Sequence, residues 1–200
     1  MAQRRSLILG ALAGATLLAG CDKLGFGAPS SKPAFKGVDV TGPVFTYSLP
    51  DQNGKLRTPE DFKGKVTAVF FGYTQCPDVC PTSMAELAQV KKALGTDGDR
   101  LQALFITVDP ERDTPELLKA YVGNFDPAFL ALRGTLDQTK AAAASFKAFF
   151  AKVPGKSPDS YTMDHTAGIY LFDFDAKVRV FERYGMDVPS LTADVKALLG

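Results

Sequence analysis

The sequence predicts an α/β domain with a central mixed sheet flanked by helices. Two apolar runs rich in β-branched and aromatic residues, 66–73 (VTAVFFGY) and 101–108 (LQALFITV), are typical of strands that are buried on both faces. Each run is followed by a segment with apolar residues at helical spacing, 81–94 and 115–125. Strands that alternate with helices build such a sheet, and 200 residues with 46% hydrophobic side chains suffice for one core.

A hairpin is expected ahead of this sheet. Residues 45–49 and 56–58 flank the turn sequence DQNG at 51–54, which predicts an N-terminal hairpin. The second helix of the domain is expected to have Thr114 as its N-cap and Pro115 at its first position, where the missing N–H of proline costs nothing.

A further helix is expected as an insertion after a short strand at 130–135. This alanine-rich helix has Asp137 as its cap and runs to about Lys152. Its core-facing side chains are three aromatic ones: Phe146, Phe149 and Phe150.

The end of the chain predicts a hairpin, 168–174 with 177–184, and a closing helix at 190–199. A strand that runs into a cysteine pair at the start of a helix, followed later by a hairpin and a last helix, is the thioredoxin pattern. We therefore expect a thioredoxin-like domain over residues 38–200.

The N-terminal segment predicts export and anchoring. Residues 1–20 combine a basic start, an apolar stretch at 7–20 that is too short to span a bilayer, and small residues before a cysteine, as in a signal peptide. The sequence LAGC at 18–21 resembles the lipobox of bacterial lipoproteins, so Cys21 is expected to carry the lipid. Residues 21–37, rich in Gly, Pro and Ser, predict a flexible tether. The domain is thus expected at the cell membrane, lipid-anchored and facing the periplasm or the exterior.

The charge balance bears on the class of partner. The chain has 23 Lys and Arg against 22 Asp and Glu, and the signal peptide takes away two of the basic residues. A nearly neutral surface predicts no nucleic-acid partner.

The central motif is CPDVCP, with Cys76 and Cys80 as the only thiols of the exported domain once Cys21 carries a lipid. Outside the cytoplasm a close pair tends to oxidise unless a metal or a reductant intervenes. Three residues separate the cysteines, whereas the thioredoxin redox motif has two. At helical spacing both sulfurs would converge on one point, where a helix N-terminus favours thiolate. The pair is compatible with a structural disulfide, a redox pair or two soft ligands for Cu(I).

His165, the only histidine of the chain, is the candidate third ligand. In a thioredoxin-like fold the loop that enters the strand at 168–174 lies beside the cysteine pair. An imidazole beside two thiolates suits copper in both oxidation states, whereas structural zinc needs a fourth ligand, for which Asp78 or Asp164 would have to serve. On composition alone, a lone histidine in a loop is more often a hydrogen-bonded surface residue than a ligand.

Three blocks of the sequence resemble the signature blocks of the Sco/SenC family, which are lipid- or membrane-anchored copper proteins with a thioredoxin-like fold. The blocks are FFGYTQCPDVCP at 70–81, ITVDPERDTPELLKAY at 106–121 and YTMDHTAGIYLFD at 161–173. The resemblance covers about residues 44–199. It implies that Cys76, Cys80 and His165 bind copper and that Asp78 and Asp164 tune or orient the site.

The second block carries four further positions that match a family loop near the site: Asp109, Pro110, Arg112 and Asp113. The sequence assigns no sure role to this loop. Asp109, at the end of a strand, is expected either to hydrogen-bond to the cysteine loop or to cap the next turn.

The resemblance implies a copper chaperone that delivers copper to the copper A centre of cytochrome c oxidase, or that reduces the cysteines of that centre. The implied partners are the copper A subunit, a copper donor protein and a thiol reductant. The alternative is an enzyme, a membrane-tethered thiol-disulfide reductase with Cys76 as nucleophile and Cys80 as resolving thiol, which has no need of His165. A peroxidase of the same fold is a third hypothesis, which is disfavoured because the chain contains no Trp to help activate peroxide.

Overall fold

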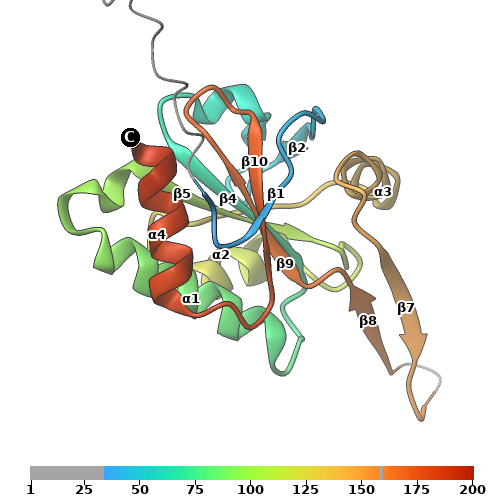
Figure 1. The fold of residues 1–200 in the computed structure, drawn as a ribbon. Coiled ribbons are helices and arrows are strands. Elements are labelled where there is room, and N and C mark those ends of the chain that lie inside the picture. The colour runs from blue at the N-terminus through green and yellow to red at the C-terminus, as the bar shows by residue number, and fades with distance from the viewer. Residues whose placement is uncertain (1–33, 158–159) are drawn as a thin grey trace, which may run out of the picture. The chain divides into compact units, whose positions relative to one another are not determined.

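The computed structural model describes residues 34–157 and 160–200 and confirms an α/β fold with a central mixed sheet (Figure 1). In this part of the chain, the main sheet has six strands in the order β1-β10-β9-β4-β5-β6. Their bounds are Val38–Asp39 (β1), Val66–Gly72 (β4), Leu101–Thr107 (β5), Leu130–Leu132 (β6), Gly168–Phe172 (β9) and Val178–Arg183 (β10). The expected signal peptide, Cys21 and the tether up to residue 33 lie outside the described residues.

The two central strands are as buried as the sequence predicts. Every residue of β4 and of β5 is buried, and the two strands run parallel from Val66 opposite Leu101 to Gly72 opposite Thr107. On its other side β4 pairs with β9 in antiparallel orientation. Because β4 and β5 end at the same edge of the sheet, the loops that follow Gly72 and Thr107 lie next to each other.

Helices cover one face of the sheet and a cluster of aromatic side chains fills the other. The helices α1 (Val79–Ala93), α2 (Pro115–Gly123) and α4 (Val188–Leu199) pack on the first face, where Tyr121 of α2 contacts Phe105 with 5.2 Å between ring centroids. On the second face lies Phe146, just after α3 (Leu136–Ser145). Its ring centroid is 5.1 Å from the ring centroids of both Phe71 and Tyr170. Figure 1 shows α4 and α3 on opposite sides of the sheet.

The expected N-terminal hairpin and the start of α2 are confirmed. Strands β2 (Leu49–Pro50) and β3 (Leu56–Arg57) pair across the 51–54 turn. The Thr114 side chain accepts a hydrogen bond from the N–H of Leu117, with Pro115 at the first helical position. Two short 3-10 helices, Pro59–Phe62 and Gly95–Arg100, precede β4 and β5.

The expected helix from Asp137 to Lys152 is wrong at both ends. Its N-cap is Thr135, whose side chain accepts from the N–H of Gln138 while the Gln138 side chain accepts from the N–H of Thr135. Helix α3 already ends at Ser145, and Lys147 then adopts a left-handed φ of 53°, which no helix can continue.

The residues beyond α3 form a hairpin that sequence reasoning missed. Strand β7 (Phe150–Pro154) pairs antiparallel with β8 (Tyr161–His165) as a separate two-stranded sheet. Of the three aromatic residues expected in the core, Phe146 is buried and Phe150 is half-buried, but Phe149 is 63% exposed. Its predicted place in the core was therefore wrong.

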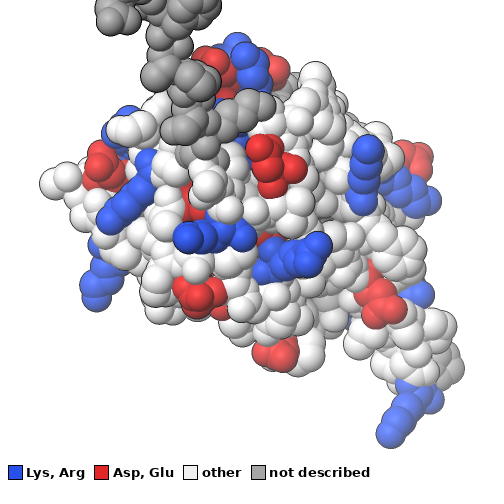
Figure 2. All heavy atoms as spheres, viewed as in Figure 1, with Lys and Arg blue, Asp and Glu red and all other residues white. Residues whose placement is uncertain are grey.

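The surface is of mixed charge on the face that Figure 2 shows, where basic and acidic side chains are interspersed. Among the helices of the described residues, none combines the length and the apolar character that a membrane span requires.

Candidate metal centre

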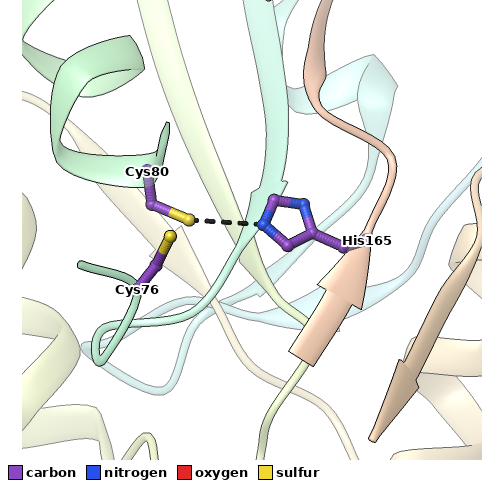
Figure 3. Close-up of side chains that lie close together, drawn as sticks. All are labelled: Cys76, Cys80 and His165. Carbon is purple, nitrogen blue, oxygen red and sulfur yellow. Dashed lines mark hydrogen bonds between the residues drawn. The ribbon is translucent and has the colours of Figure 1, made fainter. Parts of the chain in front are cut away.

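Three side chains from separate parts of the chain converge at the edge of the sheet (Figure 3). The sulfurs of Cys76 and Cys80 and a ring nitrogen of His165 all lie within 4.8 Å of one another. The Sγ of Cys80 is 3.5 Å from Nε2 of His165, and both cysteines are free thiols. The structure therefore brings together the three ligands that the sequence predicts.

The two cysteines reach this point from different kinds of backbone. Cys80 is the second residue of α1, whereas Cys76 belongs to the loop between β4 and α1. A hydrogen bond of 3.2 Å from the N–H of Cys76 to the carbonyl of Tyr73 closes that loop. The sulfurs thus converge from one loop residue and one helix residue, and the expectation that both cysteines lie on one helical face was wrong.

Gly72, the last residue of β4, leaves the space that Cys80 needs. A Cβ at this position would lie 2.9 Å from the Sγ of Cys80 and 2.8 Å from the rings of Phe70 and Phe105. Sequence reasoning passed over this residue, although a glycine that interrupts an aromatic and β-branched strand is a known sign of close approach.

Burial decides the protonation of Cys80 in the metal-free protein. The side chain has no exposed surface, and this burial raises the pKa of its thiol far above the usual value, with Cys76 and Asp113 adding to the rise. The helix N-terminus was expected to favour the thiolate, but burial has the larger effect on the pKa of Cys80. Metal binding at Cys80 must therefore release a proton, as binding to any thiol ligand does.

The imidazole of His165 is oriented for metal binding. Its Nδ1 lies 3.1 Å from the carbonyl oxygen of Thr166, which can only accept, so Nδ1 carries the proton and Nε2 presents its lone pair to the sulfurs. Burial lowers the pKa of His165, which keeps the ring neutral at pH 7. The rings of Phe70 and Tyr73 pack edge-on against it at 6.0 Å.

His165 lies at the end of a strand and not in a loop. It is the last residue of β8, opposite Phe150 of β7. The position of the third ligand therefore depends on the β7–β8 hairpin, which stands outside the main sheet.

The two acidic residues that the resemblance implies at the site lie at its rim. Asp78 and Asp164 are both exposed, and neither belongs to the group of converging ligand atoms. Asp78 immediately precedes α1, but its side chain makes no capping hydrogen bond. The charge of Asp164 acts on His165 only as a minor cause that raises its pKa.

The loop after β5 connects both halves of the site, in a way that neither expected role of Asp109 describes. The Asp109 carboxylate accepts hydrogen bonds from Nε of Arg112 and, at 2.9 Å, from the hydroxyl of Tyr161. It is Asp113 that binds the cysteine loop, by accepting from the N–H and the hydroxyl of Thr74.

The chemistry of the donor set fits copper. Two sulfurs and one imidazole nitrogen are soft and borderline ligands, which suit Cu(I) and, through the nitrogen, Cu(II). Structural zinc takes four protein ligands, and the described residues offer only these three in one group.

A thioredoxin-like domain whose edge carries two cysteines and one histidine defines a class of thiol-based metal or redox proteins. Within that class the chain belongs to the SCO1/SenC family, whose model matches residues 39–200. The SCO2-like protein of Rickettsia felis is 39% identical over 132 residues, which are 66% of this chain and 64% of that protein. The match thus spans a little under two thirds of this relative.

Solved structures of the family share the fold. A structure described as Bradyrhizobium japonicum ScoI with copper bound is 44% identical, covers 79% of this chain and all of that one, and has a TM-score of 0.71. A SCO1/SenC family lipoprotein from Bacillus anthracis is 26% identical, with a TM-score of 0.70 over 84% of this chain and all of that one. BsSco, described as having a disulfide switch and as a member of the Sco family of cytochrome c oxidase assembly proteins, is also 26% identical, with a TM-score of 0.61 over 82% of this chain and 96% of that one.

Proposed function

We propose that this protein binds copper through Cys76, Cys80 and His165 and is a metallochaperone for the copper A centre of cytochrome c oxidase. The observation that carries the proposal is the convergence of two free thiols and one correctly oriented imidazole within 4.8 Å. The copper-bound relative from Bradyrhizobium japonicum supports the choice of metal, and the description of BsSco supports the choice of oxidase.

The unequal burial of the two cysteines suggests an order of transfer. Cys80 is fully buried, whereas Cys76 is partly exposed in its loop. A thiolate of the acceptor therefore reaches the copper ion from the Cys76 side and replaces Cys76 first. Cys80 and His165 hold the ion until a second acceptor ligand completes the exchange, so that free copper is never released.

The remaining partners follow from this role. A copper donor protein loads the site, and a thiol reductant keeps Cys76 and Cys80 reduced outside the cytoplasm. A lipid on Cys21 anchors the domain to the cell membrane, facing the periplasm or the exterior, near the membrane-bound oxidase. The lipoprotein from Bacillus anthracis supports this form of attachment.

The direct test is a titration of the reduced, oxygen-free domain, first with Cu(I) and then with Cu(II), while the visible spectrum is recorded. We expect one equivalent of each ion and intense sulfur-to-copper charge-transfer bands in the Cu(II) form. Cys80→Ser should abolish both forms of binding, and Cys76→Ser should abolish the bands. Absence of tight copper binding to the wild-type domain would refute the proposal.

A second function, thiol-disulfide reduction, is favoured by the same adjacent free thiols. The Cys76 thiolate would attack a target disulfide, and Cys80 would then resolve the mixed disulfide, releasing the reduced target and leaving a Cys76–Cys80 disulfide for the reductant to restore. Stopped-flow reduction of a disulfide peptide by wild type and by His165→Ala distinguishes the two functions. If the protein is a reductase, His165→Ala should reduce the disulfide at the wild-type rate. If it is a copper chaperone, the same variant should lose Cu(II) binding.

A further inference from the structure

The loop between β5 and α2 holds the two halves of the metal centre with two neighbouring residues. Asp113 accepts hydrogen bonds from Thr74, which lies two residues after the end of β4 and two residues before Cys76. Arg112 instead reaches β8, the strand that ends at His165. One short loop therefore contacts both the cysteine arm and the histidine arm.

Arg112 makes a dense set of contacts with β8. Its Nη1 donates to the backbone carbonyl of Tyr161 at 2.9 Å, and its guanidinium carbon lies 3.5 Å from the centroid of the Tyr161 ring. The Tyr161 hydroxyl donates to Asp109, which also accepts from Nε of Arg112. These contacts form a closed ring of three residues, so the start of β8 is fixed in both position and orientation.

The same guanidinium also touches the cysteine arm. Its Nη1 donates to Oε1 of Gln75 at 3.1 Å, next to Cys76 in the chain. Its Cζ lies 5.7 Å from the centroid of the Tyr73 ring, which packs edge-on against His165. Arg112 is therefore a bridge from the loop that carries one ligand to the strand that carries another.

Stability alone is a poor reason for this arrangement. Nη2 of Arg112 is buried without a hydrogen-bond partner among the described residues, which is unfavourable for the fold. A partly buried ion pair is also weak support for stability, because desolvation offsets its attraction. The planar guanidinium of Arg112, by contrast, donates hydrogen bonds to several acceptors in fixed directions. This is the property that a positioning residue requires.

We infer that Arg112 is a positioning residue that holds the His165 strand at a fixed distance from the cysteine loop and thereby sets the preference of the site for Cu(II) over Cu(I). The inference rests on the proposed function, copper at Cys76, Cys80 and His165. Cu(I) is held mainly by the two thiolates, whereas Cu(II) depends on the imidazole as well. Loosening β8 therefore weakens one oxidation state far more than the other.

The test compares Arg112→Ala with a matched control, Arg133→Ala. Arg133 also binds this loop, through two hydrogen bonds to the carbonyl of Pro110 at 2.9 and 3.3 Å, but none of its hydrogen bonds goes to β8 or to the cysteine loop. Residues that orient metal ligands typically change affinity by about 10- to 100-fold, so we expect Arg112→Ala to weaken Cu(II) by that factor and Cu(I) by less than about threefold. Arg133→Ala should show no such difference between the two ions.

Two milder variants divide the effect. Tyr161→Phe removes the hydroxyl that binds Asp109 but keeps the ring beneath the guanidinium, and we expect it to weaken Cu(II) less than Arg112→Ala does. Arg112→Lys keeps the positive charge but not the planar guanidinium, and we expect its Cu(II) affinity to stay below that of wild type, as in Arg112→Ala. Full Cu(II) affinity in Arg112→Lys would overturn the inference. So would an Arg112→Ala variant that, like Arg133→Ala, weakens Cu(II) and Cu(I) by the same factor.

Amide hydrogen exchange of the metal-free protein separates this inference from the proposed function. Exchange in β8, from Tyr161 to His165, should be faster in Arg112→Ala than in wild type or Arg133→Ala. If wild type binds no copper but this difference is seen, the proposed function fails while the positioning role stands. Unchanged exchange in β8 would contradict the positioning role, whatever the copper affinity.

Discussion

The cysteine arm and the histidine arm of the metal centre have unequal supports. Cys80 lies in the first turn of α1, packs into the core and touches the end of the central strand β4. His165 ends a two-stranded hairpin whose strands, within the described part of the chain, pair only with each other. The first arm is part of the folded core. The second lies outside the main sheet and is joined to the core by the buried Met163 and by contacts of Arg112 and Tyr161.

This difference suggests how one site serves two oxidation states. Under the proposed function, we expect the two thiolates to hold Cu(I) and the separately held imidazole to add the affinity for Cu(II). Changes to the cysteine arm should therefore affect both ions, and changes to the histidine arm should affect mainly Cu(II). Three variants test this difference between the two arms, and we give them in order of decreasing expected effect on copper binding.

Gly72→Ala should have the largest effect. The added methyl group would lie 2.9 Å from the Sγ of Cys80 and 2.8 Å from two aromatic rings, so Cys80 or the rings must move. Overpacking of this kind costs about 1 to 3 kcal/mol of stability, and the displaced sulfur should weaken Cu(I) and Cu(II) together. Chemical denaturation and both titrations measure these effects. Loss of Cu(II) alone would show that the cysteine arm is not the rigid one.

Asp164→Asn should have a small effect on Cu(II) only. The carboxylate is exposed and acts on His165 through charge, so its removal should weaken Cu(II) by less than about fivefold. Asp99→Asn, an exposed carboxylate in the 3-10 helix before β5, is the control. A loss of Cu(II) binding as complete as that of a ligand variant would make Asp164 a ligand itself.

Glu182→Gln should leave copper binding unchanged and alter the pH dependence of stability. Burial, followed by the nearby carboxylate of Asp194, raises the pKa of Glu182 to about 8. The unfolded chain loses this proton near pH 4.5, so the folded protein alone holds it between the two values, and stability falls as pH rises through that window.

The Gln variant lacks this slope. We expect it to be close to wild type at pH 5 and more stable by about 1 to 3 kcal/mol above pH 8, as measured by denaturant unfolding. Parallel stability curves for the two proteins across this range would show that Glu182 does not titrate as stated.

The parts of the fold that follow from local patterns were predictable. The buried runs that became β4 and β5 and the capped start of α2 carry their signals in neighbouring residues. The cysteine and histidine ligands were also predictable, because they are the only residues of their kinds in the domain.

The β7–β8 hairpin was not predictable in the same way. The segment FKAFFAKVP continues the apolar character of the preceding helix. The end of that helix depends on the left-handed backbone of Lys147 and on the pairing of β7 with β8, which lies later in the chain. The roles of Arg112 and Asp113 depend on partners 37 to 49 residues away, so no local pattern could assign them.

The affinities of His165→Ala for Cu(I) and Cu(II), measured on the same reduced samples as wild type, test whether His165 is a ligand for Cu(II) and whether Cu(I) needs it. We predict that the charge-transfer bands and tight binding of Cu(II) are lost, while Cu(I) remains bound through Cys76 and Cys80. An unchanged Cu(II) spectrum would remove His165 from the ligand set, and equal loss of both ions would contradict the division of the site into two arms.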